Sequence, residues 1–251
     1  MIAKIMIVLP LYNEVAVLAN LLDDIAYVMT RYKFYDYEVI AVDDGSTDYS
    51  ADILKDKEKA MPLKILRHDM NLGFGITLRD GLAECAKSCK NRDIIISLDG
   101  DFTHKPSLIP KMVRRLQQGY DVIIASRYQN KSRVVGVPAI RRFLSLIASC
   151  LFRLLFPISG VRDYTCNYRA YRGKLIINAF NKYNQRFVDE RGFQATADIL
   201  FKLRKMGLKF SEVPLILRYD HKKGKSKMNL IGTVWNTFIL VIKTIFFELR
   251  S

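Results

Sequence analysis

Two aspartates with one residue between them, Asp99 and Asp101, follow an apolar run at residues 93–98. Such a run is typical of a buried strand, so both carboxylates are expected at a strand end. Paired carboxylates suit a hard divalent cation, Mg²⁺ or Mn²⁺, which also binds diphosphate oxygens. The cation would be a Lewis acid that neutralises a departing nucleoside diphosphate. An isolated pair more often forms a turn and a helix cap, but Asp43 and Asp44 upstream favour the metal site.

Short apolar runs that position these residues alternate with helical segments through the first half of the chain. The predicted strands cover residues 5–9, 37–42, 63–66, 93–98 and 121–125. The predicted helices cover residues 15–31, 48–59, 75–90 and 107–118. This alternation predicts an α/β fold, in which helices cover both faces of a mostly parallel sheet. Ligands of such sheets gather at the carboxyl ends of the strands.

Polar motifs follow the first four predicted strands. They are residues 10–14 (PLYNE), 43–48 (DDGSTD), 71–75 (NLGFG) and 99–101 (DGD). One such loop is weak support for a binding site, whereas four at the same sheet edge indicate one. The chain has neither the GxGxxG fingerprint of dinucleotide-binding proteins nor the GxxxxGK[ST] phosphate loop, so the carboxylates are its main candidates for chemistry.

The charge of the 251-residue chain is distributed unevenly. The formal net charge is +15, made up of −2 in residues 1–125 and +17 in residues 126–251. The second half is therefore expected to face an anionic partner, which could be a membrane, a phosphorylated substrate or nucleic acid. Nucleic acid is not the expected partner, because no helix-turn-helix, zinc-finger or RNP-type motif occurs.

The four cysteines include no CxxC pair, which argues against zinc and favours a reducing, cytoplasmic compartment. The apolar N-terminus is broken by Pro10 and has no small-residue cleavage site, so it predicts a strand and not a signal peptide.

The motifs together resemble family-two glycosyltransferases, which are inverting enzymes with a GT-A fold. The likeness is carried by PLYNE, VDDGSTD, NLGFG, DGD with His104 and Pro106 after it, and the Ser-Arg-Tyr triplet at 126–128. It extends from Pro10 to Met228. Within the family, the chain is most similar to the dolichyl- and polyprenyl-phosphate sugar synthases, the group of dolichol-phosphate mannosyltransferase.

This resemblance implies a donor site for a nucleoside-diphosphate sugar. Its residues would be Pro10, Tyr12, Glu14, Asp43, Asp44, Gly73, Asp99, Gly100, Lys225 and Lys227. The first three would line the base and ribose pocket, and the next two would contact the nucleoside. Asp101 and Asp99 would hold Mg²⁺ or Mn²⁺, and Lys225 and Lys227 would close over the diphosphate.

The resemblance also implies an acceptor site for a phosphate. In the polyprenyl-phosphate branch, an arginine after the fifth strand and an Arg-x-x-x-Ser pair on the next helix bind this phosphate. The matching residues are Arg127, Arg141 and Ser145, and Arg127 joins Asp99 and Asp101 as an expected catalytic residue. Further matches are the Gly-x-Ser-Lys at 224–227 and residues 163–170, which resemble the family stretch Asp-x-Thr-Ser-Gly-Phe-Arg.

Three residues depart from the family pattern. His221 stands where the family has an arginine three residues before the glycine of Gly-x-Ser-Lys, and Arg218 lies one turn earlier. Thr103 stands where a glutamine often serves as a further metal ligand, and it would bind the cation weakly or through water. Asn167 stands in place of the glycine of the Asp-x-Thr-Ser-Gly stretch, which is tolerable if the residue is left-handed.

The acceptor determines whether a base is needed. A sugar hydroxyl needs a carboxylate base, whereas a phosphate monoester is already anionic at neutral pH. The Glu-Asp dipeptide and the QxxRW motif of processive family-two enzymes do not occur here. Glu190 or Asp189, ahead of a predicted helix at 194–206, is the alternative base, although acidic residues there also suit a helix N-terminus.

Two segments raise the question of a membrane. Polar residues recur every four positions through residues 141–156, and the polar residues of 230–249 share one arc. The longest charge-free run in the second segment, residues 228–242, is shorter than the ~20 residues that span a bilayer. We expect amphipathic helices lying in the membrane surface. Packing into the protein's own core, and a further C-terminal transmembrane segment, are the alternatives.

The expected organisation is a GT-A catalytic domain at residues 1–228, with a nucleotide-sugar half at 1–125 and an acceptor half at 126–228. Residues 229–251 would form the interfacial helix. The expected function is metal-dependent transfer of a hexose, with GDP-mannose as the first candidate donor, to polyprenyl or dolichyl phosphate at the cytoplasmic face of a membrane. The alternatives are transfer to a glycan hydroxyl and a non-catalytic membrane-surface scaffold. The donor sugar could equally come from UDP-glucose or UDP-N-acetylhexosamine after small pocket changes.

Overall fold

The computed structural model describes residues 3–32, 36–221 and 230–249. Its strands are β1 (Lys4–Leu11), β2 (Asp36–Asp43), β3 (Leu63–Arg67), β4 (Ile94–Ser97), β5 (Val122–Ser126), β6 (Arg133–Val135), β7 (Arg169–Arg172), β8 (Phe210–Pro214) and β9 (Ile216–Arg218). Its α-helices are α1 (Val15–Arg31), α2 (Ser50–Glu58), α3 (Phe74–Ser88), α4 (Ile109–Gln117), α5 (Ala139–Leu155), α6 (Gly173–Tyr183), α7 (Ala195–Arg204) and α8 (Leu230–Leu249). Three short 3₁₀ helices are η1 (Pro106–Leu108), η2 (Asn184–Phe187) and η3 (Tyr219–His221).

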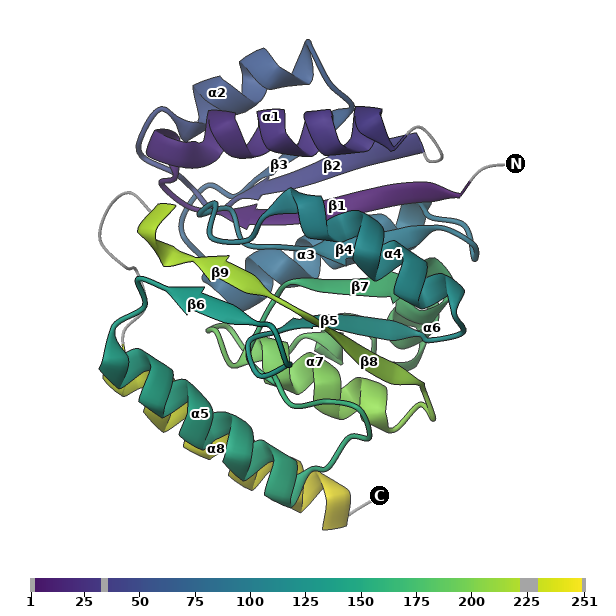
Figure 1. Cartoon of the computed structure of the whole chain (residues 1–251), viewed down its shortest axis with the longest axis vertical. Helices are drawn as coiled ribbons and strands as arrows, with labels where there is room; N and C mark the ends of the chain where they lie inside the picture. The colour runs from purple at the N-terminus through teal and green to yellow at the C-terminus, as the bar shows by residue number, and fades with distance from the viewer. Residues whose placement is uncertain (1–2, 33–35, 222–229, 250–251) are drawn as a thin grey trace.

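Seven strands form one sheet in the order β3-β2-β1-β4-β7-β5-β8. All neighbours are parallel except β7, which runs antiparallel to both β4 and β5. Helices α1 and α4 lie on one face, and α3, α6 and α7 lie on the other (Figure 1). The five predicted strands and four predicted helices of the first half are therefore confirmed, as is the mostly parallel sheet.

The four strands after β5 carry weaker sequence signals. β7 reads Arg-Ala-Tyr-Arg, and its first arginine is fully buried. The Arg169 guanidinium donates to the carbonyls of Thr196 at 2.6 Å and Tyr164 at 2.9 Å. These long-range bonds compensate the burial of the charge, so the strand depends on partners that a local pattern does not reveal.

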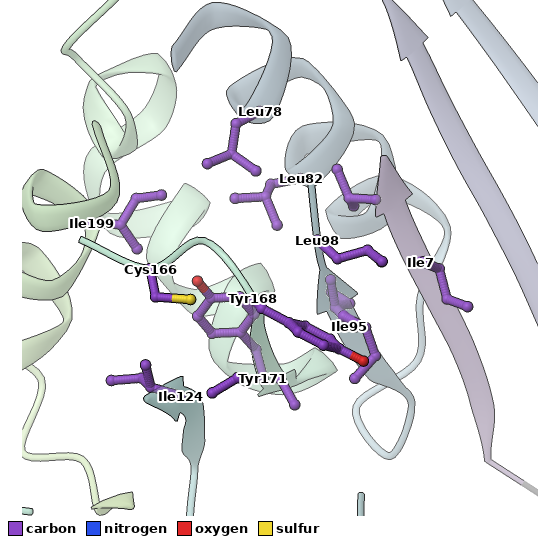
Figure 2. Packing of buried hydrophobic residues seen from close by; sticks show 14 of the residues in the cluster. Ile7, Leu78, Leu82, Ile95, Leu98, Ile124, Cys166, Tyr168, Tyr171 and Ile199 are labelled. Carbon is purple, nitrogen blue, oxygen red and sulfur yellow. The ribbon is translucent and has the colours of Figure 1, made fainter. Parts of the chain in front are cut away.

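The core extends over both faces of the sheet, and Figure 2 shows part of it on the α3 face. Figure 2 shows Leu78 and Leu82 of α3 above Ile95 and Leu98, with Ile124 of β5 below. Cys166 and Tyr168 lie among these aliphatic side chains. Burial raises the pKa of the Cys166 thiol to about 12, so it is a neutral core group. All four cysteines are free.

The helices α5 and α8 keep many apolar side chains exposed. On α5 these include Phe143, Ile147 and Leu154, whereas Ser149 faces inward and is buried. On α8, Trp235 and Phe238 are exposed, while Leu240 and Val241 join the core. Phe152 of α5 belongs to the core, but the exposed apolar side chains of this helix are not packed into the protein. In the described part of the chain, no helix is both long and apolar enough to span a bilayer.

Candidate functional site

The loops after β1 and β2 are joined through one asparagine. The side-chain oxygen of Asn13 accepts a hydrogen bond from the backbone amide of Thr47 at 2.8 Å, and the backbone amide of Asn13 donates to the Ser46 hydroxyl at 2.9 Å. The Glu14 amide similarly donates to the Ser50 hydroxyl at 3.0 Å. The PLYNE and DDGSTD motifs therefore form one connected wall at the carboxyl edge of the sheet.

The three predicted donor residues of PLYNE lie along this wall. Pro10 is buried at the end of β1, and Tyr12 is half-buried in the loop that follows. Glu14 is buried just before α1, where its carbonyl accepts the amides of Val17 and Leu18. Their contacts with a base and ribose stay predictions.

Asp43 and Asp44, at the end of β2, are both buried but have different partners. Asp43 Oδ1 accepts the Ser46 amide at 2.9 Å, and its Oδ2 lies 3.5 Å from Arg67 Nε. Asp44 accepts the amides of Leu72 and Gly73, both at 2.9 Å. Asp44 therefore shapes the NLGFG loop, a role that adds to the nucleoside contact predicted for it.

His68 adds a third contact to Asp44. Its Nδ1 lies 2.7 Å from Asp44 Oδ1, and its Nε2 lies 3.2 Å from Asp80 Oδ2. The imidazole thus connects the end of β2 to α3, where Asp80 lies. Sequence reasoning missed this residue, because nothing in its local pattern distinguishes it from an ordinary surface histidine.

Close backbone packing explains the glycines of NLGFG. Gly73 has a φ of 99°, which side chains rarely adopt. At Gly75, a Cβ atom would lie 1.8 Å from the Glu190 carbonyl oxygen, and the Gly75 amide donates to the Arg191 carbonyl at 2.7 Å. The start of α3 is therefore pressed against the segment that precedes α7.

The DGD motif forms the loop after β4, as predicted. Asp101 Oδ1 accepts both the amide of Thr103 at 3.1 Å and its hydroxyl at 2.7 Å. Gly100 lies against β1, where a Cβ atom would come within 3.0 Å of the Pro10 carbonyl oxygen. Thr103 is buried, and its two hydrogen bonds fix the position of the Asp101 carboxylate. A direct contact of Thr103 with a metal stays a prediction.

The chemistry of this loop fits a divalent cation. Asp99 and Asp101 supply hard carboxylate oxygens one residue apart, and the Asp99 side chain is about a third exposed. No cluster of three His, Cys, Asp or Glu side chains suited to a metal occurs among the described residues. The two carboxylates of the DGD loop are hard oxygen donors, which fit Mg²⁺ or Mn²⁺.

Arg127 directly follows β5 and forms a bidentate pair with Asp163. Its Nε and Nη2 lie 2.8 and 2.6 Å from the two carboxylate oxygens, and its amide donates to Oδ2 at 3.0 Å. Burial disfavours both charges, but their mutual attraction prevails. It raises the pKa of Arg127 above its ordinary value and holds the pKa of Asp163 below its own. Both groups are thus charged at neutral pH.

A chain of hydroxyl groups connects Arg127 to α5. Arg127 Nη2 donates to Thr165 Oγ1 at 2.6 Å, and this oxygen lies 3.2 Å from Ser145 Oγ. The Tyr128 hydroxyl donates to Ser145 Oγ, also at 3.2 Å. The structure therefore brings Arg127 and Ser145 together, although they lie on different elements.

Arg141 lies one helical turn before Ser145 on α5. Its Nη1 donates to the Tyr219 hydroxyl at 2.7 Å, and its guanidinium lies 6.0 Å from the centroid of that ring. Because residues four apart share a helix face, Arg141 and Ser145 lie along the same side of α5. We call Arg127, Arg141, Ser145 and Thr165 the basic-hydroxyl cluster.

The basic-hydroxyl cluster and the DGD loop are connected by residues 163–167. Asp163 holds Arg127, Thr165 contacts Ser145, and the Asn167 side-chain amide donates to Asp99 Oδ1 at 3.0 Å. The expected donor and acceptor halves thus meet at one place.

A model of glycosyl transferase family 2 matches residues 6–183. The chain belongs to this family. Dolichol-phosphate mannosyltransferase of Pyrococcus furiosus is 26% identical over 174 residues, which are 69% of this chain and 47% of that protein. Undecaprenyl-phosphate 4-deoxy-4-formamido-L-arabinose transferase of Photorhabdus laumondii is 30% identical over 175 residues, 70% of this chain and 51% of that protein. The chain spans about half the length of these two relatives.

The family-two fold is also found in solved structures. Glucosyl-3-phosphoglycerate synthase from Mycobacterium tuberculosis, determined with Mn²⁺, UDP and glucosyl-3-phosphoglycerate, matches with a TM-score of 0.64 and 19% identity. The match covers 97% of this chain and 78% of that one. At this identity the likeness concerns the fold, which is GT-A as predicted.

Glu190, the alternative base, has two partners in this family-two domain. Its Oε2 accepts the Gln194 amide at 3.0 Å, and its Oε1 accepts Lys243 Nζ of α8 at 2.9 Å. This bond raises the pKa of Lys243. Asp189 is exposed, and its amide donates to Asp198 Oδ2 at 3.0 Å. Glu190 therefore connects α8 to the segment before α7, and its role as an alternative base stays a prediction.

Asn167 does not have the left-handed backbone under which its replacement of the family glycine was considered tolerable. Asn167 is not among the described residues with positive φ, and the residue instead uses its side chain to bind Asp99. Asp163, Thr165 and Asn167 alternate in the sequence with Tyr164, Cys166 and Tyr168, but Asp163 and Asn167 are buried as well, so this alternation does not reveal the contact with Asp99. The predicted diphosphate contacts Lys225 and Lys227 lie outside the described residues.

Proposed function

We propose that the protein transfers a hexose from a nucleoside-diphosphate sugar to the phosphate of a polyprenyl or dolichyl phosphate. The expected donor is GDP-mannose, and the expected place is the cytoplasmic face of a membrane. The observation that carries the proposal is the basic-hydroxyl cluster, which residues 163–167 connect to Asp99. The names of the relatives from P. furiosus and P. laumondii, both lipid-phosphate sugar transferases, support the same acceptor class.

The chemistry of the cluster suits a phosphate better than a hydroxyl. Arg127 and Arg141 are cations, and Ser145 and Thr165 can donate hydrogen bonds, so the cluster can hold an oxyanion. Asp163, the carboxylate that lies within the cluster, is engaged by both Arg127 nitrogens and is a poor proton acceptor. A phosphate monoester brings its own negative charge and needs no base.

The donor would bind at the carboxyl ends of β1, β2 and β4. Asp99 and Asp101 would hold Mg²⁺ or Mn²⁺, which would supply Lewis-acid stabilisation to the departing diphosphate. The wall formed by PLYNE and DDGSTD would take the nucleoside. Pro10, Tyr12 and Glu14 contribute to this wall from β1 and the loop after it.

In the proposed reaction, an oxygen of the lipid phosphate attacks the anomeric carbon of the sugar. The bond from that carbon to the diphosphate breaks on the opposite side, so the anomeric configuration is inverted. Arg127, Arg141 and Ser145 position the attacking phosphate. Most of the rate acceleration would come from this positioning and from charge stabilisation, because little proton transfer is required.

The lipid acceptor would approach the site from a membrane surface on which α5 lies. The exposed apolar residues of this helix, Phe143, Ile147 and Leu154 among them, lie on the same helix as Arg141 and Ser145. Arg142 and Arg153 are exposed on α5 as well. Basic residues near anionic lipid contribute about 1 kcal/mol each to binding. This combination supports an anionic bilayer surface as the partner of α5, with the lipid phosphate next to the cluster.

A radiolabel transfer assay with the purified protein tests the proposal directly. GDP-mannose, UDP-glucose and UDP-N-acetylglucosamine are supplied in parallel with Mg²⁺ or Mn²⁺ and a short polyprenyl phosphate. Transfer to the phosphate, and none to the matching unphosphorylated prenol, is the expected result. Nucleotide binding without transfer to the phosphate from any donor would contradict it. Loss of transfer to a glycan hydroxyl in a Glu190→Gln variant would then identify the alternative reaction.

The Arg141→Ala variant is expected to raise the KM for the lipid phosphate by about 10-fold or more, since a charge-assisted hydrogen-bond donor is lost. The KM for the nucleotide sugar should change little. Arg114→Ala, at an exposed position on α4 away from α5, is the control. Steady-state kinetics with each substrate varied separately provide the measurement. An unchanged KM for the lipid would remove Arg141 from the acceptor site.

The Leu154→Glu variant is expected to weaken binding to anionic vesicles by about 10-fold, because it places a charge on the apolar face of α5. Leu154 is 79% exposed, so the fold should tolerate the change. Co-sedimentation with phosphatidylglycerol vesicles measures binding, and Tyr49→Glu, at a 75% exposed position on the rim of the sheet, is the control. Equal binding of both variants and the wild type would exclude α5 as the docking surface.

A further inference from the structure

We propose that Asn167 is a positioning residue, which fixes the Asp99 carboxylate for the cation and the nucleotide sugar. The inference rests on the proposed function, because it takes Asp99 as a residue of the donor site. Asn167 stands where the family resemblance has glycine, and a glycine could not make this side-chain contact.

The sheet places these two residues opposite each other. β4 and β7 are antiparallel, with Ser97 paired with Arg169. Continuing this register by two residues beyond the end of β4 brings Asp99 opposite Asn167. The Asn167 amide donates to Asp99 Oδ1 at 3.0 Å, so the side chains bridge the point where the two strands separate.

The Asn167 backbone is held independently of Asp99. The Ser97 hydroxyl donates to the Asn167 carbonyl at 2.6 Å, and both groups are buried. The next residue, Tyr168, is fully buried, and its hydroxyl donates to the Lys105 carbonyl at 3.0 Å. The side-chain amide of Asn167 is therefore held next to Asp99 in a well-packed position, and the residue is only 4% exposed.

The other described contacts of Asp99 involve its backbone amide and leave Oδ2 without a hydrogen bond from a described residue. The Asp99 backbone amide donates to His104 Nδ1 at 3.2 Å. This nitrogen lies 3.7 Å from Asp99 Oδ2, too far for a hydrogen bond. Asn167 thus occupies one oxygen and sets the plane of the carboxylate, which leaves Oδ2 for a ligand. Groups that orient a metal-ligating carboxylate commonly contribute 10- to 100-fold to metal affinity.

A double-mutant cycle separates positioning from packing. The affinity for Mn²⁺ is measured by electron paramagnetic resonance in the presence of GDP, with UDP in a parallel series and no acceptor. The four proteins are the wild type, Asn167→Ala, Asp99→Ala and the double variant, and thermal unfolding of each is recorded. We expect Asn167→Ala to weaken Mn²⁺ binding about 10-fold in the wild-type background. In the Asp99→Ala background, its effect should fall below about 2-fold.

Equal losses from Asn167→Ala in both backgrounds would overturn the inference, since the residue would then act through general packing. No loss in the wild-type background would overturn it too. Wild-type protein that binds Mn²⁺ with a nucleotide but transfers no sugar to the lipid phosphate would contradict the proposed function alone. Wild-type protein that binds no Mn²⁺ would remove the role of Asp99 and, with it, that of Asn167.

Discussion

Replacing Asp101 with alanine is expected to lower kcat by about 10³-fold, with the fold intact. The estimate corresponds to the several kcal/mol that a bound cation supplies to charge stabilisation. Asp101 is only partly buried, and its carboxylate accepts the amide and the hydroxyl of Thr103, a near neighbour in the chain. Its loss should therefore affect the DGD loop and not the core. Initial rates at saturating substrates, measured over a range of Mg²⁺ and Mn²⁺ concentrations, test this expectation.

Asp56→Ala is the matched control for this variant. Asp56 lies on α2, is 79% exposed and pairs only with Lys59 among the described residues. Such an exposed ion pair contributes little to stability, so this control should retain wild-type rates. Near-normal turnover by the Asp101→Ala protein in the presence of metal would show that Asp101 is not a metal ligand.

Replacing Arg127 with alanine is expected to destabilise the protein by about 3–5 kcal/mol, in addition to removing the acceptor cation. The change leaves the fully buried Asp163 without its bidentate partner. A double variant, Arg127→Met with Asp163→Asn, removes both charges and should recover part of this loss. Denaturant unfolding at neutral pH measures both free energies. A single variant as stable as the wild type would show that the pair is dispensable.

The same pair predicts how stability depends on pH. The pKa of Asp163 is lowered in the folded protein, so its carboxylate binds protons less readily there than in the unfolded chain. The contribution is therefore fully present above the ordinary aspartate pKa of about 3.9, and it is lost as the pH falls through the folded value. Below about pH 4, the unfolding free energy of the wild type should therefore fall relative to that of the double variant. A difference that is constant from pH 7 to pH 3 would exclude this linkage.

The donor side of the site is the part that the sequence predicts well. Strands β1, β2 and β4 contain continuous apolar runs, and parallel strands must bring their carboxyl ends to one edge. The positions of Asp43, Asp99 and Asp101 follow from that rule alone. Their individual partners do not. The bonds from Asp44 to Leu72 and Gly73 depend on how the third loop folds back, which no local pattern records.

The acceptor side depends on long-range pairing that the sequence conceals. Arg127 and Ser145 could be named from the family resemblance, but Thr165 joins them only because residues 163–167 return to the sheet edge. The role of Asn167 follows from the antiparallel register of β4 and β7. Asn167 lies two residues before β7, a strand of four residues that includes two arginines, and nothing in this local sequence indicates its contact with Asp99.

The insertion of β7 between β4 and β5 also constrains how the chain is made. β5 does not pair with β4 in the finished sheet, and its two neighbours are β7 and β8. During synthesis, residues 122–126 emerge well before the residues 169–172 that attach them to the sheet. Until then the open edge of β4 and the whole of β5 lack their partners, and unpaired apolar strands are prone to association with other chains. A ribosome-bound chain from which residues 122–126 have emerged, but residues 169–172 have not, should therefore recruit chaperones more strongly than one from which β8 has also emerged.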